Sequence, residues 1–276
     1  MSVACLPWYE LPETEAAHDA LWSVLARRLR KCGVPNVPER LTRGAPVVSM
    51  LINPRLLMGQ CCGYDLIYGF ASCVQLVATP RYHATGCDGA TYRSLVLVRD
   101  DCEARSLEGL RGSVCAVNGF NSHSGANALR ALVAPLSRKG RFFSRVRISG
   151  AHINSLAFLR AREADVMAMD CVLHALLARH RPQGLKGTRV LCLSEPAPAP
   201  PIITRASADR KLIDKLRDAL GEALSDDSSR DAREAMLLDG VTLLPLQDYA
   251  KIIETESVSL RFGYREMHAR SPALAR

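Results

Sequence analysis

The sequence has no hydrophobic run long enough to cross a membrane. A spanning helix needs about 20 consecutive apolar residues, and every apolar run among the 276 residues is far shorter. The N-terminus has neither a basic segment nor an apolar core, so it does not resemble a signal peptide. As it stands, the sequence predicts a cytoplasmic protein, or a periplasmic one if a signal was removed.

Paired cysteine spacing is also missing. There are ten cysteines, yet none forms a Cys-x-x-Cys motif. Cys5, Cys73 and Cys115 lie within apolar runs, where a thiol behaves as a small hydrophobic group. This usage is more typical of a reducing compartment than of a disulfide scaffold.

Lysine is scarce, with 6 lysines against 30 arginines, and the net charge is +8. The basic residues are scattered, and the densest run lies within 138–147. A basic patch could bind nucleic acid, but a solvated charged face explains it as well. Aromatic residues do not interleave with the charges, so single-strand binding has no support. We therefore expect no nucleic-acid partner.

The order of apolar runs predicts alternating strands and helices. Helical spacing appears at Leu21, Leu25 and Leu29. Further runs predict strands at 3–6, 47–52, 65–68 and 74–78, a short helix at 54–58 and a later helix at 232–238. Such alternation favours an α/β protein with mostly parallel sheets. The proline-rich segment 195–201 is a linker or a surface loop.

One stretch combines a strand, a small-residue turn and a helix start. The apolar run 113–117 ends at Asn118, and helical spacing begins near Leu129. Ser122 or Ser124 is the expected N-cap, and His123 between them is expected on the surface. A helix N-terminus favours anions, so this stretch is either an ordinary capped helix or a ligand site.

Several short motifs follow one another in a recognisable order. They are Tyr-Arg-Ser from Tyr92, Val-Asn-Gly-x-x-Ser-x-Ser-Gly from Val117, then His152, then Ala-Asp-Val-x-Ala-x-Asp ending at Asp170. This order resembles the phosphate/phosphite/phosphonate-type solute-binding proteins of ABC transporters. The resemblance implies a two-lobed type II periplasmic-binding-protein fold, in which each lobe is a mostly parallel sheet flanked by helices. It implies a discontinuous lobe 1–95 plus 203–276, a second lobe 96–202, and a ligand cleft between them.

The resemblance also implies a set of ligand-binding residues. Hydroxyl and amide side chains at the helix start would form an anion cradle, with a histidine, a carboxylate and three tyrosines around it. Asp170 would need a donor on the ligand, because a carboxylate cannot accept from an ionised oxyanion. His152 and Asp170 could instead be helix caps, and Tyr92 could be a core residue. The complete set is Tyr9, Tyr64, Tyr92, Asn121, Ser122, Ser124, His152 and Asp170.

The implied function is capture of a small anionic ligand, phosphonate-like or phosphate-ester-like, for uptake or sensing. No chemistry, cofactor or metal is expected. The partner would be an ABC transporter permease, and the protein itself is expected to be a monomer. The alternative is a cofactor-biosynthesis enzyme on the same fold, similar to thiamine pyrimidine synthases. Those enzymes have a cysteine-rich iron motif, which only Cys61 and Cys62 faintly resemble.

Overall fold

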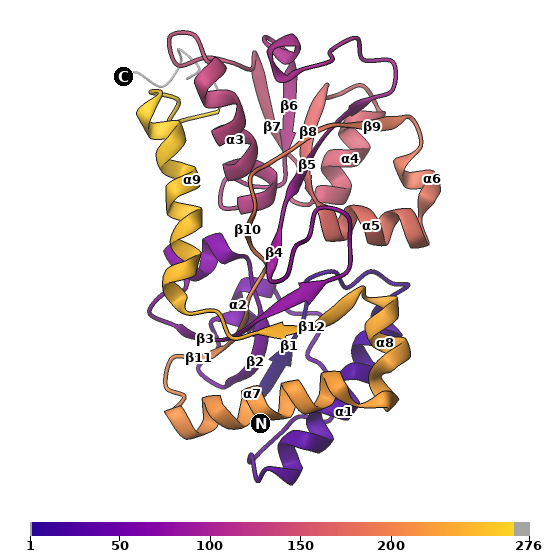
Figure 1. Ribbon diagram of the computed structural model, residues 1–276, viewed down its shortest axis with the longest axis vertical. Coiled ribbons are helices and arrows are strands. Elements are labelled where there is room, and N and C mark those ends of the chain that lie inside the picture. The colour runs from indigo at the N-terminus through magenta and orange to yellow at the C-terminus, as the bar shows by residue number, and fades with distance from the viewer. Residues whose placement is uncertain (1, 268–276) are drawn as a thin grey trace. The chain divides into compact units, whose positions relative to one another are not determined.

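The computed structural model describes residues 2–267, shown as a ribbon in Figure 1. Contacts divide the chain into two compact units. Among the described residues, unit 1 comprises 2–91 and 198–249, and unit 2 comprises 92–197 and 250–267. The lobes expected from the sequence place residues 250–276 in the first lobe, whereas contacts place residues 250–267 in unit 2. Residues 268–276 lie outside the described residues. Within the described residues, no helix is long and apolar enough to cross a membrane.

Unit 1 is built on a mixed sheet in the order β1-β2-β11-β3-β12. β1 and β2 are parallel, β11 is antiparallel to β2 and to β3, and β12 is antiparallel to β3. The sheet is mixed because β11, from the returning part of the chain, enters between two strands of the first part. The strands are β1 (Val3–Cys5), β2 (Leu56–Gln60), β3 (Val74–Tyr82), β11 (Ile202–Arg205) and β12 (Leu238–Thr242).

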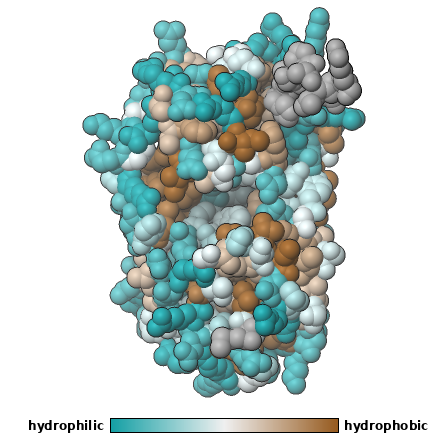
Figure 2. All heavy atoms as spheres, turned by 180° about the vertical axis from the view of Figure 1, so that it is seen from behind, coloured by the Kyte–Doolittle hydropathy of each residue, from teal (hydrophilic) through white to brown (hydrophobic). Residues whose placement is uncertain are grey.

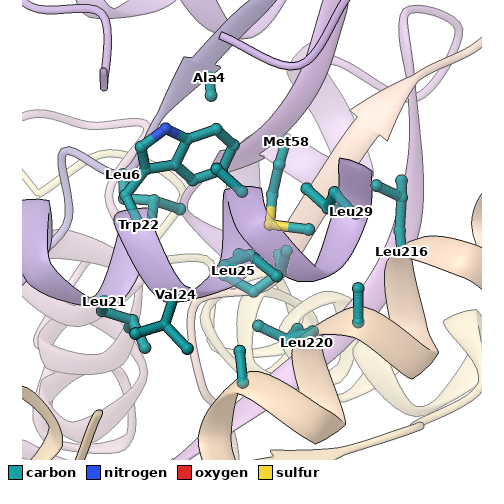
Figure 3. Packing of buried hydrophobic residues seen from close by; sticks show 14 of the residues in the cluster. Ala4, Leu6, Leu21, Trp22, Val24, Leu25, Leu29, Met58, Leu216 and Leu220 are labelled. Atoms are coloured by element: carbon teal, nitrogen blue, oxygen red, sulfur yellow. The ribbon is translucent and has the colours of Figure 1, made fainter. Parts of the chain in front are cut away.

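Two long helices bury their apolar faces in the core of unit 1. Helix α1 (Glu15–Lys31) contributes Leu25 and Leu29, which are fully buried and four residues apart on one face. Figure 3 shows them near Met58 of β2 and near Leu220 of α7 (Arg210–Ser225). The short helices of this unit are α2 (Val47–Leu51), α8 (Arg230–Ala235), a π-turn at Asp65–Gly69 and 3-10 turns at Asp227–Ser229 and Leu246–Tyr249.

Three local predictions in unit 1 are wrong, and a fourth, a helix, has the wrong end. Residues 47–51 form helix α2 rather than a strand, and 56–60 form strand β2 rather than a helix. Residues 65–69 form a π-turn, and the helix predicted at 232–238 ends at Ala235 before β12 begins. Short apolar runs do not distinguish a buried strand from a helix. Residues 56–60 are all buried within the sheet, which explains why they form a strand and the preceding residues 47–51 form the helix.

Unit 2 has a sheet in the order β7-β6-β8-β5-β9. β6 is parallel to both β7 and β8, while β5 is antiparallel to β8 and β9. The strands are β5 (Ser94–Arg99), β6 (Val114–Val117), β7 (Arg145–Ile148), β8 (Val166–Asp170) and β9 (Thr188–Leu193). The carboxyl ends of β6, β7 and β8 therefore lie at one edge of the sheet.

Helices follow those three strands in unit 2. Helix α3 (Ala128–Val133) comes after β6, α4 (His152–Arg160) after β7 and α5 (Cys171–His180) after β8. Figure 1 shows the last helix, α9 (Ala250–Arg261), beside α3. The remaining short elements are α6 (Pro182–Leu185), 3-10 turns at Leu107–Leu110 and Ala134–Leu136, and a π-turn at His123–Asn127.

Helix α9 is joined to α3 by polar contacts. The Arg130 guanidinium donates to Glu256 at 2.8 Å, and Asn127 Nδ2 donates to the Ile252 carbonyl at 3.2 Å. These bonds explain why α9 belongs to unit 2.

The two segments that pass between the units, β4 (Thr91–Tyr92) and β10 (Ala197–Pro198), pair with each other. Hydrophilic side chains cover most of the face in Figure 2.

We expect Leu25→Ala to lower the free energy of unfolding by about 2–5 kcal/mol, because it leaves a cavity at a fully buried position. Urea unfolding followed by circular dichroism measures this change. The matched control is Leu243→Ala in the same unit, where the side chain is 57% exposed and little change is expected. Equal effects of the two substitutions would contradict this packing of α1.

Candidate ligand-binding site

The three loops at one edge of the unit 2 sheet bring distant residues together. The loop after β6 leads to Ser122, the loop after β7 leads to His152, and β8 ends at Asp170. Because β6 is paired in parallel with both neighbours, these loops meet at the carboxyl ends of the strands. Ligands of open α/β sheets bind at such edges.

Ser122 caps the helical segment that runs from the π-turn into α3. Its backbone is extended, and its Oγ accepts from the Gly125 N–H at 3.1 Å. Its carbonyl accepts from Ala126 and Asn127, at 3.3 and 3.0 Å. Of the two serines predicted as the N-cap, Ser122 is confirmed. The cap leaves other first-turn N–H groups without partners inside the helix, which suits an anion.

Ser124 and His152 are joined directly. Ser124 Oγ lies 2.9 Å from His152 Nε2, and the serine is 6% exposed. Burial lowers the pKa of His152 to about 4, against the opposing effect of the Ala168 carbonyl. The ring is therefore neutral at pH 7. Its other nitrogen, Nδ1, is buried without a hydrogen bond of standard geometry among the described residues.

Asn118 was not predicted as a site residue, yet it lies against the helix start. A Cβ placed on Gly125 would lie 1.8 Å from Asn118 Oδ1 and 3.0 Å from His152 Cε1. The Asn118 side chain can therefore lie this close to residue 125 only because that residue is glycine. Asn118 Oδ1 is buried without a hydrogen bond among the described residues. The sequence signal was available, since Asn118 immediately follows β6 and Gly125 lies in the first helical turn.

Asp170 caps helix α5. Its Oδ1 accepts from Val172 N at 2.8 Å and from Leu173 N at 3.2 Å, and the side chain is 3% exposed. The capping alternative is thus confirmed. A ligand-binding role for this carboxylate stays a prediction.

His123 was predicted on the surface, and that prediction is wrong. Its side chain is 3% exposed, and its ring lies 6.2 Å from the Tyr92 ring between centroids. Its Nδ1 is 3.2 Å from Asn127 Nδ2. Burial lowers the pKa of His123 to about 4. The ring is held inside because α9 covers this part of the helical segment, which local sequence does not show.

The remaining predicted residues lie elsewhere. Asn121 is exposed in the loop before the cap. Tyr9 and Tyr64 belong to unit 1. Tyr9 is buried edge-on against Tyr82 with ring centroids 5.0 Å apart, and Tyr64 is tilted against Tyr68 at 4.6 Å. Contact of these three residues with a ligand stays a prediction, as it does for Tyr92, which is buried.

The cysteine pair considered for iron lies inside unit 1. Cys61 and Cys62 are buried, and burial raises the pKa of Cys61 well above its ordinary value. Burial therefore disfavours the free Cys61 thiolate. Within residues 2–267, no three His, Cys, Asp or Glu side chains are grouped so as to hold a metal ion.

Residues 3–249 match the model of a known family. The family is described as "ABC transporter, phosphonate, periplasmic substrate-binding protein". A comparison with curated proteins found no match.

Solved structures share the fold at low identity. A binding protein component of an ABC phosphonate transporter from Pseudomonas aeruginosa has TM-score 0.74 and 14% identity, covering 95% of this chain and 87% of its own. PhnD1 from Prochlorococcus marinus, solved with methylphosphonate, has TM-score 0.73 and 12% identity, covering 96% and 98%. XAC2383 from Xanthomonas citri, solved with ATP, has TM-score 0.69 and 18% identity, covering 95% and 98%.

We expect Gly125→Ala to destabilise the protein by about 1–3 kcal/mol, because the added methyl group displaces the Asn118 amide. Chemical denaturation measures the change. Adding Asn118→Ala should restore part of the loss. The control is Gly221→Ala within α7, where a Cβ meets nothing within 4 Å and should stabilise by about 0.5–1 kcal/mol. Wild-type stability of Gly125→Ala would rule out the close approach.

The stability of the protein should also fall in acid. The pKa values of His123 and His152 are about 4 in the folded chain, below the ordinary value of about 6.5. Below that ordinary value the unfolded chain binds protons that the folded chain does not. The stabilisation is therefore complete above pH 6.5 and is lost as the pH falls toward 4. Each histidine contributes a slope of up to about 1.4 kcal/mol per pH unit.

Urea unfolding between pH 7 and pH 4.5 measures this slope. His152→Gln should reduce it. His83→Gln should leave it unchanged, because the His83 side chain is exposed. An equal slope in wild type and His152→Gln would contradict burial of a neutral His152.

Proposed function

Because the chain belongs to the phosphonate periplasmic substrate-binding protein family of ABC transporters, we propose that it binds a small phosphonate or phosphate ester at the start of the helical segment after β6. Ser122, Ser124 and His152 of unit 2 are the central residues of the proposed site. The function is capture without chemical conversion.

The bond between Ser124 Oγ and His152 Nε2 carries this proposal. It joins two segments that follow different strands, at the positive end of a helix. An isolated helix cap needs only Ser122, so the second serine and the histidine are not explained by capping. Neutral donors beside helix N–H groups are suited to an oxyanion.

The Ser124–His152 pair can serve a ligand in either protonation state. When the neutral imidazole carries its proton on Nε2, Ser124 accepts from it and donates its own hydroxyl proton to an ionised ligand oxygen. When the proton is on Nδ1, Ser124 donates to Nε2 and offers a lone pair to a P–OH group. Burial keeps the ring neutral at pH 7, and the Ala168 carbonyl, which can only accept, favours the arrangement with the proton on Nδ1.

Asp170 would add selectivity to the proposed site. Its Oδ1 is occupied as the cap of α5. Contact between its carboxylate and a ligand would therefore require a ligand donor such as a P–OH group or an amine. Tyr92 and Asn121 are proposed as further contacts from the neighbouring segments of unit 2, and Tyr9 and Tyr64 as contacts that unit 1 contributes.

The proposed role is uptake or sensing. A substrate-binding component of an ABC transporter passes a small ligand to a permease, so we propose a permease as the partner of this chain and the periplasm as its location. Methylphosphonate, which is bound in the PhnD1 structure, is the first ligand to test, with inorganic phosphate, a phosphate monoester and ATP as comparators.

Ser124→Ala should weaken methylphosphonate binding by about 10–100-fold, because it removes one hydrogen bond to a charged group. Isothermal titration calorimetry measures this affinity. The control is Ser144→Ala, an exposed serine of unit 2 that only donates to the Ser113 carbonyl. Its affinity should equal that of wild type.

Two results would count against the proposed function. The first is that neither phosphonates nor phosphate esters raise the melting temperature of the wild-type protein, although a ligand at 100 times its Kd should stabilise it by about 2.7 kcal/mol. The second is equal affinity of Ser124→Ala and wild type.

A further inference from the structure

Segment 109–162 of unit 2 contains basic residues throughout but no aspartate or glutamate. Its densest group of cations is Arg138, Lys139, Arg141 and Arg145. All four residues are exposed. Within residues 2–267, none of the four side chains takes part in a hydrogen bond or an ion pair. The proposed ligand-binding site uses none of these charges.

A tight turn carries three of these cations. Arg138 N donates to the Arg141 carbonyl at 2.8 Å, and Arg141 N donates to the Arg138 carbonyl at 3.0 Å. The two residues between them, Lys139 and Gly140, have positive φ angles of 51° and 69°. Positive φ at both central residues is typical of a type I′ turn. The three charged side chains therefore project from a short loop whose backbone is fixed.

The turn lies at the sheet edge opposite the candidate ligand-binding site. Ser144 N donates to the Ser113 carbonyl at 3.0 Å, just before β6 begins. Arg145 begins β7 and pairs with Val114, the first residue of β6. The cations therefore gather at the amino ends of β6 and β7, whereas the candidate ligand-binding residues follow the carboxyl ends.

Three acidic side chains at the amino edge of this sheet are already paired with other arginines. They belong to the end of β5 and to the residues that lead into β8. Their partners are outside the group of four cations, so these pairs do not neutralise the group. The pairs are Asp101 with Arg162, Asp165 with Arg99, and Glu163 with Arg147.

An exposed aromatic side chain lies close to the turn. A Cβ placed on Gly140 would lie 3.3 Å from the carbonyl oxygen of Gly263, just beyond the end of α9. The preceding residue, Phe262, is 50% exposed, and Leu260 in the last turn of α9 is 48% exposed. Large apolar side chains next to several cations are typical of segments that lie on an anionic membrane surface.

We propose that this basic edge of unit 2, formed by Arg138, Lys139, Arg141, Arg145 and Phe262, binds the surface of an anionic phospholipid bilayer. The cations lie against the lipid phosphates, and the Phe262 ring enters the boundary between headgroups and acyl chains. A field of phosphates needs no pocket, which agrees with cations carried on a turn and a strand end. The chain also belongs to a family of ABC transporter components, which act beside a membrane.

A triple variant of the turn tests the proposal. Arg138→Gln/Lys139→Asn/Arg141→Gln removes three positive charges and keeps the backbone of the turn, because asparagine before glycine is favoured in a type I′ turn. Thermal melting checks that the variant is folded. Sedimentation with vesicles measures binding, with phosphatidylcholine alone compared with an equal mixture of phosphatidylcholine and phosphatidylglycerol.

The matched control removes the same number of charges from unit 1. Arg40→Gln/Arg55→Gln/Lys211→Gln changes three exposed residues whose side chains have no ion pair among the described residues. The two triple variants have the same net charge. A difference between them therefore reports the position of the cations rather than their number.

Wild type should bind the vesicles that contain phosphatidylglycerol and not those of phosphatidylcholine alone, with an affinity that falls as salt is added. The turn variant should bind about 100-fold more weakly, because each cation near an anionic surface contributes about fivefold. The unit 1 variant should bind within a few-fold of wild type. Phe262→Ser should weaken binding by about tenfold, because it removes the apolar contact.

The proposal is overturned if wild type does not bind the anionic vesicles, or if the two triple variants bind them equally. Binding to DNA that the turn variant abolishes, without binding to vesicles, would assign the basic edge to nucleic acid instead. This inference goes beyond the proposed function and fails separately from it. The turn variant should bind methylphosphonate as wild type does, because the cations lie at the opposite sheet edge from the candidate ligand-binding site.

Discussion

The parallel pairing of β6 with both β7 and β8 is the constraint on which the candidate site depends. It places the ends of three strands at one sheet edge, so residues from three separate segments meet there. The Ser124–His152 bond exists only because the loops after β6 and β7 lie side by side. The same edge carries Asp170, which is used to start α5. The cap of α5 and the candidate ligand-binding residues therefore lie at the same edge of the unit 2 sheet.

This sheet edge also carries buried polar side chains that are uncharged at pH 7. Desolvation lowers the pKa of both His123 and His152 to about 4, so two imidazoles stand there uncharged at pH 7. The Asn118 oxygen, on the same side of Gly125 as His152, is buried without a hydrogen bond within residues 2–267. Buried polar groups without hydrogen-bond partners lower the stability of the folded state, unless a ligand or another group supplies the missing partners. A bound oxyanion would accept from the donors at this edge, whereas the Asn118 oxygen would need a ligand donor such as a P–OH group. Ligand capture is therefore a physical explanation for retaining these polar groups.

Some of the site followed from sequence alone. Small polar residues after an apolar run predicted the Ser122 cap, and the capping alternative for Asp170 came from its place between a strand and a helix. The swap of helix and strand at 47–60 did not follow, because short apolar runs fit both. His123 was placed on the surface because, within one turn, it points away from Ser122 and Ser124. Helix α9 packs against this turn, and local pattern does not connect the two.

The sequence by itself determined the α/β class, the helix start at Ser122 and the family motifs, because these depend on neighbouring residues and their spacing. The tertiary structure alone decided that Ser124 bonds to His152 and that α9 belongs with α3. It also decided the orientation of the Asn127 amide, whose oxygen accepts from Arg130 and whose nitrogen donates to the Ile252 carbonyl of α9. The Ser124–His152 and Asn127–Ile252 bonds join segments far apart in the chain, and no periodic pattern encodes which distant groups meet.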